Sequence, residues 1–209
     1  MNRKRLECNL QMVDGFTNPK LSFEQYNTSA QLASQMLYTA HSQYDDIDDS
    51  LVGDFGCGCG VLGIGSLMLG ASHCIGFDID SSALEICQKN INEFDMDDSF
   101  DLVNCDIASP PTIMKSNVFD VVVMNPPFGT QNSGVDFNFL KAAHSCCCGP
   151  VYSLHKTSTR KYVLSSLQKI GIKGEVLAEV RYELLNTMKI HKKKSVDVAV
   201  DFIRSVAID

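Results

Sequence analysis

Four consecutive residues carry groups that could hold a planar amine: Asn125, Pro126, Pro127 and Phe128. They follow the apolar run 121–124, which predicts a buried strand, so they stand at the strand end that faces the ligand crevice in an open parallel sheet. Two successive prolines stiffen the turn and remove two N–H donors. An amide, outward carbonyls and an aromatic ring suit a flat base with an exocyclic amine. Taken alone, the tetrapeptide also fits a tight turn after a core strand.

A glycine-rich loop earlier in the chain has the pattern of a site for the amino-acid part of a ligand. Asp54 is followed by Gly56, Gly58 and Gly60, and the helix expected from Val61 begins directly after them. Glycines at alternate positions allow a close backbone approach, and the helix N-terminus offers unpaired N–H groups. The spacing differs from the dinucleotide pattern G-x-G-x-x-G. An acid before G-x-G-x-G suits an ammonium and a carboxylate instead.

Two further acids follow the next two expected strands. Asp78 lies 22 residues beyond Gly56, where a carboxylate can accept hydrogen bonds from both hydroxyls of a ribose. Asp106 stands just after the third strand and could receive an adenine amine. Each residue alone could equally be a loop acid or a helix cap. The ordered set, however, indicates a ligand that combines a nucleoside with an amino acid.

Strands and helices alternate along the chain from residue 51 onward. Apolar patterning predicts strands at 51–55, 74–77, 100–104, 119–124, 151–154, 175–184 and 196–203, and helices at 28–40, 61–69, 82–94, 137–147 and 159–170. Thr28 with Gln31, and Ser82 with Glu85, fit capping boxes at two helix starts. Residues 1–27 are expected to be a polar lead-in.

This alternation predicts an α/β fold. We expect a three-layer α/β/α sandwich with a seven-stranded, mostly parallel, Rossmann-like sheet whose last strand is antiparallel. A single domain is expected over residues 1–209, with an amino-terminal segment and helix (1–50) before the Rossmann-like core (51–209).

The composition fits one medium-sized domain without a membrane segment. The chain has 209 residues, 44% of them hydrophobic, and no apolar run approaches the roughly 18 residues of a membrane span. Its nine cysteines include Cys57-x-Cys59 and the contiguous Cys146-Cys147-Cys148, neither with the usual spacing of zinc ligands. We therefore expect free thiols in a reducing compartment, no signal peptide and no metal in this chain.

The charges are divided unevenly between the two parts of the chain. Residues 1–140 hold 6 basic and 19 acidic residues, a balance of −13, whereas residues 141–209 hold 12 basic and 6 acidic residues, a balance of +6. Such a division could present one basic face to phosphates. We expect Lys192, Lys193 and Lys194, between the last two strands, to contact phosphates, with Arg3, Lys4 and Arg5 as a second arm. A solvated surface without a partner is the alternative.

Five motifs taken in order resemble those of the class I S-adenosylmethionine-dependent methyltransferases. They are EQYNT (24–28), DFGCGCG (54–60), GFDID (76–80), MNPPFGT (124–130) and HKKKS (191–195). Within that class they are similar to the N6-adenine methyltransferases of small-subunit ribosomal RNA, and the resemblance runs over nearly the whole chain. Asn27 is a departure, because this family usually has proline there.

The resemblance implies a set of ligands, partners and contacts. S-adenosylmethionine would be the methyl donor, contacted by Gln25, Thr28, Gly56, Cys59, Val61, Asp78, Asp106 and Asn125. The family also implies a heterodimer with a small zinc-binding activator subunit shared by several methyltransferases. Location in the nucleus, including the nucleolus, and in the cytoplasm would follow from the ribosomal RNA substrate.

The third strand gives a physical reason for such a partner. In this fold class it is normally a sheet edge, and Phe100, Leu102 and Val103 make it apolar. An uncovered apolar edge invites pairing with another chain. We therefore expect the activator to bind along residues 100–104.

Methyl transfer to adenine requires that the exocyclic amine be held with its lone pair towards the donor. We expect the Asn125 side-chain oxygen and the Pro126 carbonyl to accept the two N–H bonds, with Phe128 stacked on the base. A base inside a helix cannot reach such a pocket, so the target adenosine is expected to be unpaired.

Two alternatives come from other functional classes. Protein glutamine N5-methyltransferases also use Asn-Pro-Pro with an aromatic residue, although that residue is usually tyrosine and a helical domain precedes the core. A non-catalytic cofactor-binding assembly subunit is the second alternative. It has no physical need for both an intact glycine loop and an intact Asn125–Phe128 turn.

Overall fold

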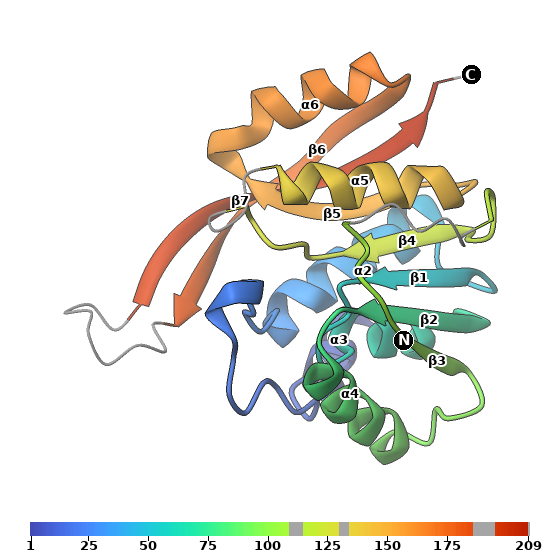
Figure 1. Ribbon diagram of the computed structural model, residues 1–209. Helices are drawn as coiled ribbons and strands as arrows, with labels where there is room; N and C mark the ends of the chain where they lie inside the picture. Colours follow the sequence, from blue (N-terminus) through green and yellow to red (C-terminus); the bar gives the residue numbers. More distant parts are fainter. Residues whose placement is uncertain (109–114, 130–133, 186–194, 209) are drawn as a thin grey trace.

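A twisted seven-stranded sheet forms the centre of the computed structural model, which describes residues 1–108, 115–129, 134–185 and 195–208. The strands are β1 (Leu51–Phe55), β2 (His73–Asp78), β3 (Phe100–Asn104), β4 (Val121–Met124), β5 (Val151–Lys156), β6 (Ile172–Leu185) and β7 (Ser195–Ala207). Their order is β3-β2-β1-β4-β5-β7-β6, and β7 runs antiparallel to both neighbours while β1 to β5 are parallel (Figure 1). The predicted α/β sandwich with an antiparallel last strand is confirmed.

Helices cover both faces of this sheet. They are α1 (Arg3–Leu10), α2 (Ala30–Tyr44), α3 (Val61–Met68), α4 (Ser81–Glu93), α5 (Val135–Cys146) and α6 (Arg160–Lys169), with short 3₁₀ turns at Leu21–Phe23 and Thr157–Thr159. The core on one face combines side chains of α1 to α4 with the strands, and the core on the other face uses α5 and α6. No helix in the described ranges is long and apolar enough to cross a bilayer.

The packing of strand β4 explains why its sequence is an unbroken apolar run. Val121 and Val123 pack into the core beneath α1 to α4, whereas Val122 and Met124 pack into the core beneath α5. All four side chains are completely buried. A central parallel strand covered on both faces requires this pattern rather than alternation.

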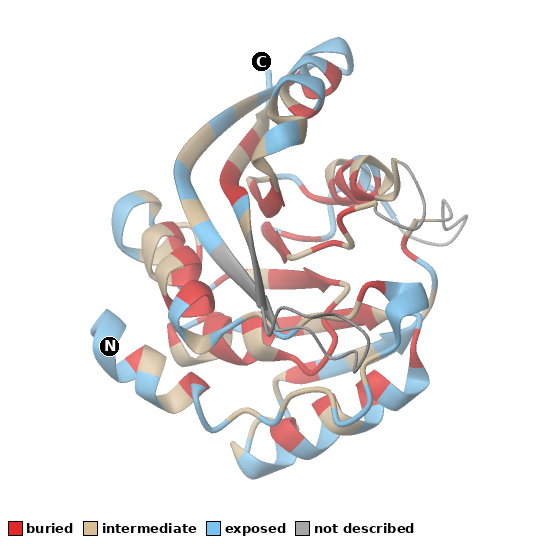
Figure 2. Cartoon of the chain, turned by 90° about the vertical axis from the view of Figure 1, so that its left-hand side faces the viewer, coloured by how far each residue is buried: buried red, intermediate tan, exposed pale blue. Residues whose placement is uncertain are grey.

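The carboxyl ends of the parallel strands form one edge of the sheet, where the chain order reverses between β1 and β4. In Figure 1 the arrowheads of β1, β2 and β4 all point to this edge, and the blue segment that leads from α1 to α2 crosses it. Figure 2 looks onto the same edge. Open α/β sheets bind ligands in the crevice outside such a reversal point. The sequence motifs that follow β1, β2 and β4 are therefore brought together here.

Both predicted capping boxes are wrong. Helix α2 is capped by Ser29, whose hydroxyl accepts a hydrogen bond from Leu32 N at 3.2 Å, and not by Thr28. Helix α4 is capped by Asp80, which accepts from Ser82 N at 3.1 Å, so Ser82 lies inside the helix. In each case a neighbouring residue that also caps well occupies the position, because serine and aspartate rank with or above threonine there.

The structure also differs from the predicted element boundaries. Residues 1–27 are not a simple lead-in, since α1 forms there with only Leu6 and Leu10 buried, a signal too short for periodicity to detect. Strands β6 and β7 are longer than predicted, and Figure 1 shows them reaching past the ends of the other strands. The predicted strand at 119–124 begins two residues later, although Phe119 still forms an isolated bridge with Cys147.

Two glycines in helix α3 offer a matched test of how tightly α3 packs on the sheet. A Cβ at Gly63 would lie 2.4 Å from Cζ of the Phe100 ring, whereas a Cβ at Gly65 would meet the mobile end of Leu37, also at 2.4 Å. Both replacements by alanine gain about 1 kcal/mol of helix propensity. We expect Gly63→Ala to lower the free energy of unfolding by about 1–3 kcal/mol, because overpacking against a rigid ring dominates.

Urea unfolding curves of the two variants measure this difference. Gly65→Ala is expected to stay within about 1 kcal/mol of the parent chain, because Leu37 can change rotamer. Equal loss of stability in the two variants would contradict the packing of α3 described here.

Candidate active site

The glycine loop between β1 and α3 is fastened to the end of β2. Gly56 N donates a hydrogen bond to the carbonyl of Phe77 at 2.8 Å, and Gly58 N donates to Oδ2 of Asp78 at 2.9 Å. Gly56, Gly58 and Gly60 have φ values of 72°, 53° and 88°. Only glycine adopts this left-handed region readily. The protein thus already holds the predicted loop in a conformation that its glycines permit.

Asp54 is a buried carboxylate beneath that loop. It is only 1% exposed, and its Oδ2 accepts a hydrogen bond from Gly63 N at 2.8 Å. Burial raises the pKa of the Asp54 carboxyl to about 7, and the charge of nearby Asp78 raises it further, although the Gly63 bond opposes the shift. A carboxylate kept away from water in this way binds a cation more strongly than one in solvent.

Asp78, at the end of β2, is held in place by backbone N–H groups on both sides. Asp80 N donates to Oδ1 at 2.9 Å, and Gly58 N donates to Oδ2 at 2.9 Å. Burial nevertheless raises the pKa of Asp78. Each carboxylate oxygen can accept more than one hydrogen bond, so both remain able to take a ligand hydroxyl.

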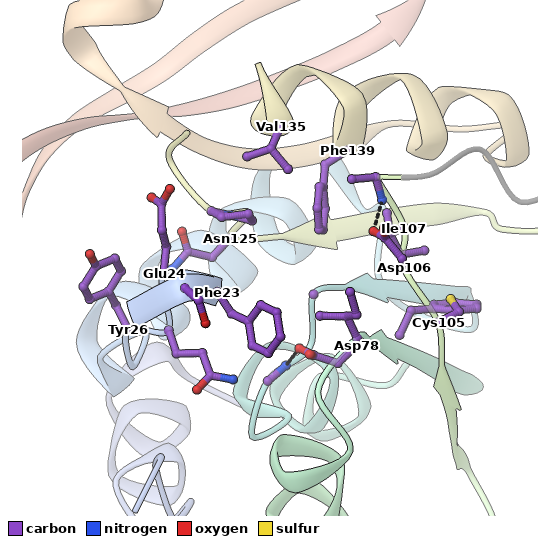
Figure 3. A pocket seen from close by; sticks show the side chains of 18 of the residues that line it. Phe23, Glu24, Tyr26, Asp78, Cys105, Asp106, Ile107, Asn125, Val135 and Phe139 are labelled. Carbon is purple, nitrogen blue, oxygen red and sulfur yellow. Dashed lines mark hydrogen bonds between the residues drawn. The ribbon is translucent and has the colours of Figure 1, made fainter. Parts of the chain in front are cut away.

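Two adjoining cavities lie over these residues. The larger has a volume of about 260 Å³ and is lined by Gln25, Asp78, Asp106, Pro127 and further side chains drawn in Figure 3. The smaller has a volume of about 140 Å³ and is lined by residues that include Thr28, Asp54, Cys59 and Val61. Both cavities share five lining residues: Phe16, Tyr26, Gly56, Gly58 and Asn125. The predicted cofactor contacts therefore gather around one site, except for Gly60, which lines neither cavity.

Asn125 stands where the two cavities meet and carries a buried polar atom without a partner. Its Nδ2 donates a hydrogen bond to Thr28 Oγ1 at 2.8 Å. Its Oδ1 is buried, and no group of the described residues donates to it. An acceptor left unsatisfied in this way costs about 1–3 kcal/mol. The side chain is thus oriented by Thr28, with its oxygen available to a donor from a ligand.

The other three residues of the tetrapeptide differ in whether they reach a cavity. Pro127 lines the larger cavity, and Pro126 is buried. Phe128 is only 8% exposed and packs in the core on the α2 side, with Lys156 Nζ 5.9 Å from its ring centroid. It does not line either cavity. Its predicted stacking on a base therefore depends on the small uncovered part of the ring.

Asp106 and Gln25 already hold partners within the protein. Asp106 Oδ1 accepts from Ala108 N at 2.9 Å, as the dashed line in Figure 3 shows. Gln25 Nε2 donates to Asp80 Oδ2 at 2.7 Å, and Lys20 Nζ contacts Oδ1 of the same carboxylate at 2.6 Å. The segment before α2 is in this way tied to the cap of α4, which places Gln25 and Thr28 at the site.

The predicted RNA-binding and partner-binding residues that the structure describes line neither cavity. Arg3, Lys4 and Arg5 are exposed on α1, and Lys192, Lys193 and Lys194 lie outside the described residues. Strand β3 is the sheet edge, as predicted. Phe100, however, is 3% exposed and turned into the core, Leu102 is half-buried, and Val103 is 38% exposed.

Several apolar residues that line the cavities were not predicted from the sequence, and Phe16, Val135 and Phe139 are among them. Phe16 comes from the long segment before α2, and Val135 and Phe139 come from the first turns of α5. Figure 3 shows Val135 and Phe139 hanging from α5 over the site. Their spacing of four residues gives one helix face, a signal that was available but is equally typical of a core contact. Nothing in the sequence marks Phe16.

One family model matches the part of the chain that runs from α2 to the turn after β4. The model for ribosomal protein L11 methyltransferase (PrmA) matches residues 31–126, less than half of the chain. The matched part contains the glycine loop, Asp78 and Asn125, and it ends within the tetrapeptide. It therefore covers the fold from α2 to the turn after β4 and leaves out the carboxyl-terminal part.

Full-length relatives extend the similarity over the whole chain. The rRNA N(6)-adenosine-methyltransferase METTL5 of Danio rerio is 51% identical, covering 98% of this chain and 98% of its own length. The corresponding Drosophila melanogaster protein is 44% identical, covering 96% and 94%. A crystal structure of a putative RNA methyltransferase from Pyrococcus horikoshii superposes with a TM-score of 0.88 at 32% identity, covering 100% and 99%.

These relatives share the length of the chain, and the solved structure shares its entire fold. The predicted resemblance is confirmed, and it includes the segments before β1 and after β4 that the PrmA model leaves out. The chain belongs to the family of METTL5-type rRNA N6-adenosine methyltransferases.

Proposed function

We propose that this chain transfers a methyl group from S-adenosylmethionine to the N6 amine of an unpaired adenosine in small-subunit ribosomal RNA. The observation that carries the proposal is the buried Oδ1 of Asn125, which has no donor among the described residues and belongs to a residue that lines both cavities. An exocyclic amine is a neutral donor of the right kind for such an acceptor. The family relationship supports RNA adenine as the substrate.

The residues of the two cavities fit the proposed methyl donor. Asp54 and the Gly58 carbonyl would accept from the ammonium of its amino-acid part in the smaller cavity, and Asp78 would accept from the ribose hydroxyls. Asp106 and Ile107 line the larger cavity, where its adenine would lie. When bound, this group supplies an electrophilic methyl on a sulfonium.

In the proposed reaction the protein acts by holding the amine in position and does not supply a general base to remove its proton. Asn125 Oδ1 and the Pro126 carbonyl would accept the two N–H bonds, which turns the nitrogen lone pair towards the methyl. Their partial negative charges would also stabilise the positive charge that develops on the amine. Phe128, kept rigid by its core packing, would stack on the base. The new N–CH3 bond would replace the S–CH3 bond of the donor, so that S-adenosyl-L-homocysteine would remain, and the proton would pass to water once the methylated nitrogen has become acidic.

A glutamine side chain in a protein is the less favoured substrate. Its planar amide could also be held by Asn125, and the PrmA family model is named for a methyltransferase of a ribosomal protein. That match, however, ends at residue 126, whereas the rRNA adenine methyltransferases match over nearly the full length. A role as a cofactor-binding subunit without catalysis leaves the orientation of Asn125 by Thr28 unexplained.

The proposal includes two kinds of partner surface. The exposed Arg3, Lys4 and Arg5, and the lysines 192–194 outside the described residues, would contact phosphates of the RNA. The zinc-binding activator would pair with the free edge of β3, adding a strand to the sheet. Because Phe100 points inwards, Val103 and the backbone would form most of that contact.

The role of Asn125 can be tested by removing its side chain. Asn125→Ala removes the proposed acceptor, and we expect kcat for RNA methylation to fall by about 10²–10³-fold or more. The affinity for S-adenosylmethionine, measured by calorimetry, should stay measurable because Asp54 and Asp78 are unchanged. Asn92→Ala, which changes an exposed asparagine on α4, serves as the control and should keep full activity. Near-normal turnover by Asn125→Ala would rule the assignment out.

The raised pKa of Asp54 predicts pH-dependent cofactor binding. A carboxyl with a pKa of about 7 is partly protonated at neutral pH, and a cationic ligand favours its ionised form. Binding near pH 7 should therefore release protons, and cofactor affinity should fall as the pH is lowered from 7.5 to 5.5. Calorimetry in buffers of different ionisation enthalpy measures the release. Asp54→Asn should bind more weakly and release fewer protons, and an unchanged release in that variant would contradict this role.

The activator site on β3 can be tested with a matched pair of exposed valines. Val103 on β3 is 38% exposed, and Val118, outside the sheet, is 37% exposed. We expect Val103→Glu to weaken the heterodimer at least tenfold and Val118→Glu to leave it intact, as measured by co-purification and calorimetry. Hydrogen exchange at residues 100–104 should slow when the activator is added. A chain that is soluble alone and binds cofactor tightly without the activator would contradict this assignment.

A further inference from the structure

An exposed group of aromatic and basic residues lies at the start of helices α5 and α6, outside both cavities. The rings of Phe137 and Tyr162 meet with centroids 6.1 Å apart and planes at 66°. Lys141 Nζ lies 5.7 Å from the centroid of the Phe137 ring, and Lys161 is exposed next to Tyr162 in the first turn of α6. These four residues are called the α5–α6 surface below.

One aromatic side chain of this surface, Tyr162, is unusually exposed to solvent. Tyr162 is 55% exposed, the highest value among the exposed tyrosines and phenylalanines of the described residues. The tilted contact with Phe137 occupies only part of its ring. Its buried neighbours Val163 and Leu167 already secure α6 to the core. Tyr162 therefore contributes little to packing and leaves an aromatic surface open to a ligand.

The α5–α6 surface is close to the active site through helix α5. Val135 and Phe139 line the larger cavity, and Phe137 lies between them on a different side of the same helix, turned to α6. An α-helix with its side chains is about 10–12 Å across. Figure 1 shows α5 and α6 both beginning at the edge of the sheet to which the arrowheads point. A nucleic-acid chain that leaves the cavity past α5 would therefore meet Phe137 and Tyr162 next.

We propose that the α5–α6 surface binds the single-stranded RNA next to the target adenosine. A base beyond the immediate neighbours of that adenosine stacks on Tyr162, while Lys141 and Lys161 contact the phosphates on either side of that base. Stacking on an aromatic side chain suits this task because every base has a π face, so the contact tolerates any sequence. The lysines add an attraction that depends on salt. The inference rests on the proposed function, since it extends the same RNA-binding site.

Charge favours RNA over a protein partner at this surface. Residues 141–209 carry a balance of +6, and three of the four residues of the surface come from this part of the chain. Asp136, the acid next to Phe137 in the sequence, is 6% exposed and turned towards His155, with Oδ2 3.4 Å from His155 Nδ1. Its charge is therefore directed away from the surface, which stays basic.

The test compares two single-stranded RNAs that carry the same adenosine. One extends several nucleotides on both sides of it, and the other ends one nucleotide from it on each side. The full chain with its activator is titrated into each labelled RNA, and binding is followed by fluorescence anisotropy. We expect Tyr162→Ala to weaken binding of the long RNA about tenfold and to leave binding of the short RNA and of S-adenosylmethionine unchanged. Tyr162→Phe, which keeps the ring, should restore the affinity.

A matched pair of lysines on α6 tests the phosphate contact. Lys161 and Lys169 are both exposed, at opposite ends of the helix. Lys161→Ala should reduce the slope of log affinity against log salt for the long RNA by about one, and Lys169→Ala should not. Turnover at saturating RNA should remain normal in all of these variants, because none removes a group of the two cavities.

Three results would overturn the inference. Tyr162→Ala could bind the long RNA with the affinity of the parent chain, or it could lose the same affinity for the long and the short RNA. It could also lose affinity for the activator while its affinity for RNA stays unchanged. The last would assign the surface to a protein contact. Failure of the proposed function would give a different result from failure of this inference. The parent chain would then methylate neither RNA, whereas the effect of Tyr162→Ala on RNA binding could still be measured.

Discussion

The hydrogen bond from Asn125 Nδ2 to Thr28 Oγ1 is the interaction on which the site depends. It joins the turn after β4 to the segment before α2, two parts of the chain that are 97 residues apart. By occupying the N–H side of the amide, it leaves Oδ1 as a buried acceptor to which no group of the described residues donates. The prolines that follow keep the turn stiff, so this orientation costs little further entropy when an amine binds.

The other half of the site is prepared in the same way by backbone groups. Asp78 and Asp54 each accept an N–H from the glycine loop or the helix after it, so loop, helix and strand ends hold one another in place. The segment before α2 is fixed in turn by Gln25 and Lys20 on Asp80. Every proposed contact with the methyl donor therefore stands on a rigid element or is tied to one, as preorganised transition-state stabilisation requires.

Much of the fold and of the site was predictable because it depends on local patterns. The apolar run of β4, the spacing of the glycines and the acids at strand ends each have a direct structural reason, and all are found as predicted. The helix caps were not, because Ser29 and Asp80 compete with Thr28 and Ser82 at adjacent positions. Thr28 is not free to cap α2 because it contacts Asn125, a tertiary interaction that no local pattern reveals. Phe16 and the inward turn of Phe100 likewise depend on contacts between distant segments.

The most direct test of the central claim is the position of the transferred methyl group. The chain, with and without its activator, is incubated with labelled S-adenosylmethionine, total RNA and ribosomal proteins, and the products are digested to nucleosides and amino acids for mass spectrometry. The site described here predicts label on the N6 amine of adenosine from small-subunit ribosomal RNA. Label on glutamine of a protein, or on a ring nitrogen of adenine, would contradict the role assigned to Asn125.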